Sequence, residues 1–474
     1  MCVAISAFAV PSAASATAPT FSVSTGLTPA ISTSVIDHVT TCPSGYVNVT
    51  SNVPRGSAVK VDGKSLKVGR TVSKVRMTPG QRFSIIIGAG KAALGHSIRC
   101  LPANFPKFTA AGTLPVSAPF AALSMPALVG SPLPYAFVID SHGTPIWWKE
   151  VPGDSVLDVK AVSGGRIAFW HGKLVEPGSD GPYSIYRLDG RLDSEVRVTG
   201  ALGDPHEMLE TGRGTWYRIA SSDRQHVDAT LYGGPADRSV HDNEIQEIDS
   251  NGNLVWSWKS RDHIAPAEST LWASYLVKAI QPDKPLDLVH MNSIEEDADG
   301  NVIVSCRHLD AVYKIRKSDG AILWKLGGST TAESLTVIGD DANGMHLGGQ
   351  HDARVLPDGT LTVYDNGSGF ANRPARGTRW AIDPAARTAT LVETLTDSSV
   401  KTSPGAGSVR KLADGSWLAS WTGTAAVRAY LPDHKVRFDL KFANNGLSYR
   451  ANPITTSQIT RAQFVAGMDA QYPR

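Results

Sequence analysis

The chain has few charged residues and little imbalance between the two signs. Charged residues make up 19% of its 474 positions, and the formal net charge is +2. We find no cluster of basic side chains, which argues against nucleic acid or an acidic membrane surface as the main partner. Uninterrupted apolar runs of about 18 residues are also missing, so we expect no transmembrane segment.

Lysine and arginine are absent before Arg55. The chain opens with an apolar stretch that ends in the small residues Ala14-Ser15-Ala16, a pattern typical of the end of a secretory signal peptide. Its charged start is missing, so we expect residues 1–16 to be a signal-peptide remnant and the natural start to lie upstream. A disordered Ala/Ser-rich terminus is the alternative. Residues 17–40, rich in Ser, Thr, Ala and Pro, predict a flexible linker.

Cysteine is scarce, with four residues in the chain. Cys2 lies in the leader, and no CxxC motif or metal-type spacing occurs, so we expect no metal ion. Cys42 and Cys100 bracket the next segment, and export would permit a disulfide between them. Cys306 is then left over as a buried thiol. These features predict a secreted or cell-envelope protein.

Residues 41–112 carry short alternating runs, such as Tyr46–Thr50 and Arg82–Ile87, separated by turn signals. This pattern is typical of strands and hairpins. We expect a small β-sandwich-like domain with a structural or display role.

Helical periodicity is almost absent from the rest of the chain, apart from a stretch near Ser269–Lys278. Instead a unit recurs in which a polar–glycine turn precedes a Trp-bearing or aliphatic strand, as in Glu244–Gly252 before Leu254–Trp258. About six such units, each with two hairpins, are typical of propeller blades. The sequence therefore predicts an all-β protein, with a six-bladed β-propeller over residues 115–474 after the sandwich-like domain.

Three of the 13 histidines share one place in the repeat. The turn glycine follows His206 and His351 by eight residues and His290 by ten. Equivalent positions in successive blades form a ring around the central channel. We therefore expect the three side chains to face one another at one end of the channel. The alternative is that each satisfies backbone groups near its own strand.

Arg307 follows the strand Val302–Cys306 and would return to the channel mouth near His290. Beside three histidines it would form a cationic pocket suited to a sulfate or phosphate group. A solvated arginine or a blade-to-blade ion pair is the alternative. Asn292 and Asn366 are candidate substrate-binding residues, and Asn366 also stands where a turn or supporting residue is expected.

Five short motifs follow one another between residues 285 and 370. They are Val289-His-Met-Asn-Ser-Ile-Glu-Glu-Asp297, Ile303-Val-Ser-Cys-Arg307, Ile322-Leu-Trp-Lys-Leu-Gly-Gly328, Gly349-Gln-His-Asp-Ala-Arg354 and Val363-Tyr-Asp-Asn-Gly367. In order and spacing they resemble the signature of the arylsulfotransferase family, and the segment that begins at His206 resembles its upstream histidine motif. The likeness covers roughly residues 130–430.

This resemblance implies a six-bladed propeller that transfers sulfate between phenols without a nucleotide donor. His351 matches the nucleophile, which becomes a sulfohistidine, while His206, His290 and Arg307 match residues that bind the sulfuryl group. The implied partners are a small phenolic sulfate donor and a phenolic acceptor, with no cofactor. Cys306 departs from the family pattern, which has a small hydroxyl residue before the arginine.

A neutral imidazole suits this chemistry because it is not repelled by the negative charge of a sulfate monoester. The sequence also fits two other functions. One is a non-catalytic exported propeller that binds glycans or protein partners. The other is a quinoprotein-like propeller, since Asp319–Trp324 resembles the Trp-bearing turns of that class. The oligomeric state is not indicated.

Overall fold

The computed structural model describes residues 18–125, 134–174, 178–342, 344–444 and 446–474. The chain forms two compact units, which we describe separately. Unit 1 comprises Met1–Ala103 and Tyr472–Arg474, and unit 2 comprises Asn104–Gln471. The predicted signal-peptide remnant, residues 1–16, lies outside the described residues.

Unit 1 contains two sheets. One consists of β1 (Thr20–Val23), β3 (Tyr46–Val53) and β6 (Gly69–Arg76), and the other of β2 (Asp37–Thr41), β8 (Leu94–Leu101), β7 (Arg82–Ile87), β4 (Val59–Val61) and β5 (Lys64–Ser65). Alternating side chains of β3 and β7, including Val47, Val49 and Ile85, enter one shared apolar core. This alternation follows from the two-residue period of a strand.

The core of unit 1 includes the predicted disulfide. Cys42 and Cys100 are bonded, with their Cα atoms 6.0 Å apart, so that pairing is confirmed, and Cys306 is the free, buried thiol. The segment predicted to be a flexible linker, residues 17–40, contains strand β1 and most of strand β2. β1 pairs with β3 and β2 pairs with β8, because partners distant in the sequence satisfy the backbone of this Ser/Thr-rich segment.

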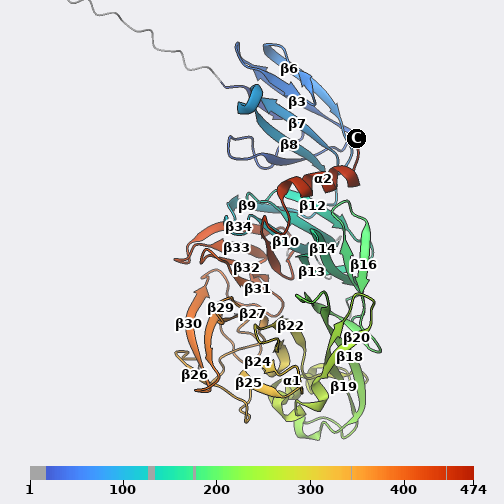
Figure 1. The fold of residues 1–474 in the computed structure, drawn as a ribbon, viewed down its shortest axis with the longest axis vertical. Coiled ribbons are helices and arrows are strands. Elements are labelled where there is room, and N and C mark those ends of the chain that lie inside the picture. Colours follow the sequence, from blue (N-terminus) through green and yellow to red (C-terminus); the bar gives the residue numbers. More distant parts are fainter. Residues whose placement is uncertain (1–17, 126–133, 175–177, 343, 445) are drawn as a thin grey trace, which may run out of the picture. The chain divides into compact units, whose positions relative to one another are not determined.

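Unit 2 contains six sheets among its described residues, each with four strands in antiparallel order (Figure 1). In chain order these are β10 (Phe120–Met125), β11 (Tyr135–Ile139) and β12 (Pro145–Glu150) with β35 (Ala451–Ile454); β13 (Ser155–Val162), β14 (Arg166–Gly172), β15 (Tyr183–Tyr186) and β16 (Leu192–Val196); β17 (Leu202–Glu210), β18 (Trp216–Val227), β19 (Arg238–Ile248) and β20 (Leu254–Lys259); β22 (Met291–Glu296), β23 (Val302–Cys306), β24 (Ala311–Ile315) and β25 (Ile322–Gly327); β27 (His351–Val355), β28 (Leu361–Asp365), β29 (Arg376–Asp383) and β30 (Thr388–Thr396); and β31 (Ser408–Lys411), β32 (Trp417–Trp421), β33 (Ala426–Tyr430) and β34 (Val436–Phe442). Short strands β9 (Phe108–Gly112), β21 (Leu286–Asp287) and β26 (Thr336–Ile338) extend three of them.

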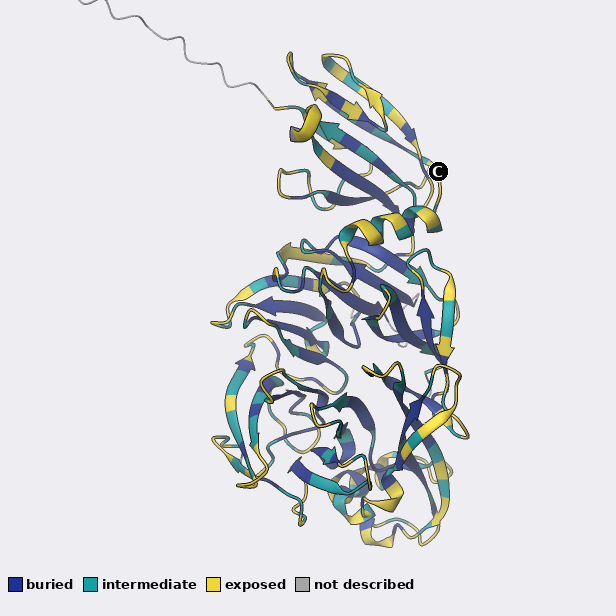
Figure 2. Cartoon of the chain, viewed as in Figure 1, coloured by how far each residue is buried: buried dark blue, intermediate teal, exposed yellow. Residues whose placement is uncertain are grey.

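These sheets form a propeller-like ring. Their inner strands contact one another in the order β13, β17, β22, β27 and β31, and β35 contacts both β31 and β13. Because β35 also pairs with β10, a strand near the end of the chain completes the first sheet. Figure 2 shows buried inner strands and more exposed outer strands such as β16 and β20. The predicted all-β class is confirmed.

The hairpin turns follow the Asp–Gly signals of the sequence. In the turn between β19 and β20, Oδ1 of Asp249 accepts the backbone N–H groups of Asn251 and Asn253, both at 2.8 Å. Gly252 has a φ of +84°, a conformation that favours glycine. Such local closure explains why hairpin positions can be read from the sequence.

Helices are few. α1 (Thr270–Ala279) lies between β20 and β22, within one residue of the predicted helix, whereas α2 (Arg461–Gln471) was not predicted. Only Phe464 and Met468 of α2 are buried, too few apolar positions to give a clear helical pattern. The 3₁₀ turns are η1 (Gly90–Ala92), η2 (Thr230–Tyr232), η3 (Ser260–Asp262), η4 (Pro266–Ser269), η5 (Arg307–Leu309) and η6 (Thr422–Thr424). No helix in the described part of the chain has the length and apolar character needed to span a membrane.

Buried ion pairs join the inner strands. The side chain of Arg450, which is 0% exposed, lies 2.9 Å from Asp158 and 3.0 Å from Glu207, with Asp352 at 3.3 Å. Arg354 also pairs with Glu207 and Asp352. Charges buried in this way need partners with good geometry. The network therefore ties β13, β17 and β27 to the segment that leads into β35.

Candidate active site

The three predicted histidines come from neighbouring inner strands. His206 lies in β17, His290 directly precedes β22, and His351 is the first residue of β27. The rings of His206 and His290 have centroids 4.8 Å apart. Ala406 donates to His351 and Pro404 accepts from Arg307, so one short segment contacts both side chains. The structure thus brings the three histidines and Arg307 together.

His351 is held in one tautomer. Its Nε2 accepts the backbone N–H of Ala406 at 3.1 Å, so the ring proton lies on Nδ1. That Nδ1–H donates to Oδ1 of Asn366 at 2.8 Å and lies 3.0 Å from the carbonyl of Gly349. Burial, with the charges of Arg307 and His206, holds the pKa of His351 well below its usual value. The imidazole is therefore neutral, with its lone pair on Nε2.

The other two histidines are each paired with a carboxylate. Nδ1 of His206 lies 2.8 Å from Asp204, and Nδ1 of His290 lies 2.5 Å from Asp287. Burial, followed by the charges of His206 and Arg307, holds the pKa of His290 well below its usual value. These carboxylates were not predicted. Their signal is an aspartate two or three residues before the histidine, which His351 lacks.

His290 adopts a backbone conformation that is uncommon for a non-glycine residue, with a φ of +54°. Its carbonyl accepts the N–H of Arg307 at 2.9 Å, which ties it to the end of β23. Conformations of this kind concentrate at functional sites, where the surrounding contacts enforce them. Here the enforced turn places the imidazole beside Asp287.

Arg307 begins η5, directly after β23. Its Nη1 donates to Nε2 of His308 at 2.5 Å, and its Nη2 donates to the carbonyl of Pro404 at 2.9 Å. The guanidinium carbon lies 4.6 Å from the ring centre of Trp272, the geometry of a cation–π contact. The guanidinium is therefore fixed from three sides.

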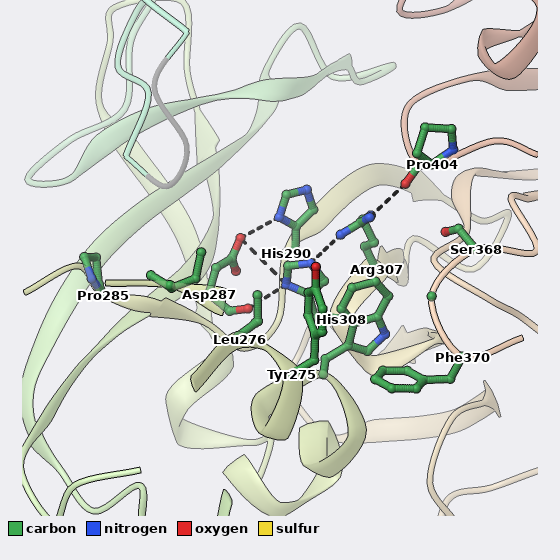
Figure 3. Close-up of a pocket in the computed structure, with 13 residues that line it drawn as sticks. Tyr275, Leu276, Pro285, Asp287, His290, Arg307, His308, Ser368, Phe370 and Pro404 are labelled. Carbon is green, nitrogen blue, oxygen red and sulfur yellow. Dashed lines mark hydrogen bonds and ion pairs between the residues drawn. The ribbon is translucent and has the colours of Figure 1, made fainter. Parts of the chain in front are cut away.

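His308 was also missed by the sequence interpretation. Because its Nε2 accepts from Arg307, its Nδ1–H donates to the backbone carbonyl of Asp287 at 2.6 Å. Figure 3 shows Asp287, His290, His308 and Arg307 joined by dashed contacts that end at Pro404. Burial, with the charge of His290, keeps the pKa of His308 well below its usual value.

A segment that we call the strap, Ser403–Gly407, covers His351. It supplies the N–H of Ala406 to His351 and the carbonyl of Pro404 to Arg307. The side-chain amide of Asn366 donates to the carbonyl of Ala406 at 2.9 Å. The strap therefore bridges the predicted nucleophile and the predicted anion-binding arginine, and His351 is 2% exposed.

A pocket of about 750 Å³ adjoins this cluster. His290 and Arg307 line it, while His206, His351, Asn292 and Asn366 do not. Its lining residues are Trp272, Tyr275, Leu276, Ile280, Pro285, Asp287, His290, Arg307, His308, Ser368, Gly369, Phe370 and Pro404. The pocket thus combines the cationic side chain of Arg307 with walls of apolar and aromatic side chains.

The two predicted substrate-binding asparagines are both buried. Asn292 donates its side-chain N–H to the carbonyl of Gln350 at 2.8 Å. Asn366 orients His351 and holds the strap through Ser403 and Ala406. Both side chains therefore hydrogen-bond to other groups of the protein and do not line the pocket.

Asp287, His290 and His308 offer ligand atoms that lie within 4.8 Å of one another, a spacing that could hold a metal ion. However, Nε2 of His308 accepts a hydrogen bond from Arg307. The permanent positive charge of that guanidinium opposes a second cation nearby. The arrangement therefore fits a hydrogen-bonded cluster better than a metal centre.

Comparisons with known proteins indicate the family of the chain. The family model for arylsulfotransferase (ASST) matches residues 153–443. The arylsulfate sulfotransferase AssT of Escherichia coli O6:H1 is 24% identical over 288 residues, 50% of this chain and 47% of that protein. The AssT of Lelliottia amnigena is 24% identical over 308 residues, 53% of this chain and 48% of that protein. The chain thus spans about half the length of these relatives.

Among solved structures, a protein of unknown function from Bacteroides caccae has a TM-score of 0.44 and 11% identity. The match covers 71% of this chain and 99% of that one. A virginiamycin B lyase from Staphylococcus aureus has a TM-score of 0.37 and 11% identity, over 70% of this chain and 87% of that one. Likeness at this level carries no argument about function.

Proposed function

The chain belongs to the arylsulfotransferase family, and from that premise we propose that it moves a sulfuryl group from a phenolic sulfate ester to a phenolic acceptor by way of a sulfated His351. The observation that carries this proposal is a cluster beside a largely apolar pocket, in which His206 lies against His290 and the strap bonds to both His351 and Arg307. We take each sheet of unit 2 as one blade, so the catalytic domain is a six-bladed propeller.

In the first half-reaction, the Nε2 lone pair of His351 forms an N–S bond as the bond between sulfur and the aryl oxygen breaks. The aryl oxygen leaves with the electron pair as a phenolate. The neutral imidazole is not repelled by the anionic ester, and two easier displacements replace one difficult step. Arg307, and His206 when protonated beside Asp204, donate hydrogen bonds to the sulfuryl oxygens.

In the second half-reaction, the acceptor phenol attacks the sulfur, and the N–S electron pair returns to His351. The phenol proton passes to Nε2 of His290, the one of the three predicted histidines that lines the pocket. Its low pKa keeps this imidazole neutral and able to accept a proton. Asp287 stabilises the imidazolium that forms. The imidazolium then releases this proton to water because its pKa is low, and the phenolate of the first step takes up a proton from water, so the cycle balances.

The proposed activity takes place outside the cytoplasm. The Cys42–Cys100 disulfide supports this location, because such bonds persist in oxidising compartments. The proposal needs a small phenolic donor and acceptor and involves no nucleotide.

The decisive experiment is intact-mass measurement after mixing the protein with 4-nitrophenyl sulfate. A covalent intermediate predicts a gain of about 80 Da that disappears on addition of phenol, with the group mapped to His351. His351→Ala should show neither adduct nor transfer, while His142→Ala, in the turn after β11, should behave as wild type. An adduct on another residue would contradict the assignment of the nucleophile. No adduct and no nitrophenol release would contradict the proposed reaction.

A further inference from the structure

The walls of the pocket come from two segments that are far apart in the sequence. α1 and the residues that follow it contribute Trp272, Tyr275 and Pro285, and the loop after β28 contributes Gly369 and Phe370. The volume of about 750 Å³ lies in the upper part of the range for small-molecule sites, about 300–1,000 Å³. One phenol ring would leave much of this space unfilled.

Trp272 forms the rigid part of the wall. It is 5% exposed, and its Nε1 donates to Oδ2 of Asp310 at 3.0 Å. A Cβ added to Gly369, which has a φ of +61°, would lie 2.6 Å from the indole. The loop backbone therefore rests directly on Trp272, so the two walls are fixed to each other. The same indole supports the guanidinium of Arg307.

Tyr275 and Phe370 form the outer part of the wall. Their rings lie 6.2 Å and 5.7 Å from that of Trp272, with interplanar angles of 87° and 83°. Tyr275 is 55% exposed and Phe370 is 40% exposed, although both line the pocket. Exposed aromatic rings beside a cavity mark a ligand surface, because a ligand that covers them removes apolar surface from contact with water. Figure 3 shows Tyr275 and Phe370 among the residues that line the pocket.

We propose that Trp272, Tyr275 and Phe370 select an extended, planar aromatic group of two or more rings on the oxygen that carries or receives the sulfuryl group. This inference rests on the proposed function and names the substrate class of the same site. Aromatic contacts add to the stabilisation that burial gives and depend on ring geometry. A saturated group of the same size gains the burial alone.

The test compares equilibrium binding of three alcohols that need not react: phenol, 2-naphthol and the saturated analogue decahydro-2-naphthol. In the wild-type protein we expect 2-naphthol to bind about tenfold more tightly than either of the others. Tyr275→Ala/Phe370→Ala should reduce this preference to less than about threefold. Leu271→Ala is the matched control, because Leu271 is 52% exposed on α1 and does not line this pocket.

Circular dichroism and the thermal midpoint report whether the variants are folded. Equal binding of 2-naphthol and its saturated analogue, or a preference that survives in the folded double variant, would overturn the inference. Because binding is measured without turnover, the result is independent of the intermediate. A protein that prefers 2-naphthol but forms no adduct on His351 would refute the proposed reaction and leave the aromatic wall standing.

Discussion

The backbone N–H of Ala406 donates to Nε2 of His351 over 3.1 Å, so the atom proposed to attack sulfur already has a partner. The donor ester must displace this hydrogen bond before an N–S bond can form. Access to the nucleophile is thereby linked to the strap, which also holds Arg307 through the carbonyl of Pro404.

Loosening the strap should accelerate sulfation. Thr422 Oγ1 donates to the carbonyl of Gly405 at 2.7 Å and lies 3.0 Å from Oγ of Ser403. Thr422→Val removes both contacts at a cost of about 1 kcal/mol of stability, and we expect the first turnover to become several-fold faster. Rapid mixing with 4-nitrophenyl sulfate measures this rate. Thr424→Val is the control, since the hydroxyl of Thr424 donates to the carbonyl of Trp421, which lies outside the strap. An unchanged or slower first turnover would show that the strap does not limit access.

The acid limit of donor activity should lie well below pH 6.5. Burial and the charges of Arg307 and His206 lower the pKa of His351, so the imidazole stays neutral as the pH falls through 6.5, its ordinary value. The pH profile of kcat/KM for the donor reports this ionisation in the free enzyme. An acid limb of this profile centred at or above pH 6.5 would contradict the expectation.

Asn366→Asp provides an internal check on that profile. The new carboxylate keeps an acceptor for Nδ1–H of His351 but adds a negative charge, which raises the imidazole pKa. The acid limb should therefore move to higher pH while transfer is retained. Asn366→Leu removes the acceptor, and we expect it to lower the sulfation rate by about 10–100-fold.

Asp287→Asn should slow the acceptor step selectively. Without the carboxylate, the imidazolium of His290 is less stable, so proton removal from an unactivated phenol suffers most. We expect about a 100-fold loss with phenol as acceptor and a much smaller loss with an acidic nitrophenol. Asp204→Asn, beside His206, should affect both acceptors alike. Equal losses for both acceptors in Asp287→Asn would remove His290 from the role of base.

Arg450→Met should destabilise unit 2 strongly. It leaves Asp158, Glu207 and Asp352 without one of their cations in a fully buried position. Breaking such pairs costs about 3–5 kcal/mol, which urea unfolding would show as a lower midpoint. Arg437→Met, at a partly buried arginine that donates to the carbonyl of Thr113, should cost less than about 1 kcal/mol. Similar costs in both variants would mean that the network adds little stability.

Local signals in the sequence predicted much of this architecture. Turn glycines such as Gly252 fix hairpins through contacts with neighbouring residues, and a helix was expected where α1 lies. The shared repeat position of His206, His290 and His351 likewise indicated that they would meet. Strands β1 and β2 and helix α2 were missed because their partners are distant in the sequence or their apolar positions are few.

The rest of the site depends on contacts that no local pattern reveals. Ala406 reaches His351 from 55 residues away, and Trp272 reaches Asp310 across 38. Neither pairing has a motif. His308 stands beside the recognised Arg307, yet its role follows only from the positions of Arg307 and Asp287 in space.

The pairing of β35 with β10 has a consequence for how the protein is made. Ala451 and Leu123 become neighbours only after almost the whole of unit 2 has left the ribosome. Chains emerge from their amino end, and contacts between distant residues form late. Until β35 arrives, the first sheet lacks its inner strand, and the strap lacks the carbonyl of Tyr449, which accepts the N–H of Gly407. A nascent chain that lacks β35 would therefore carry the histidines without a closed site, so the site can close only after β35 has been made.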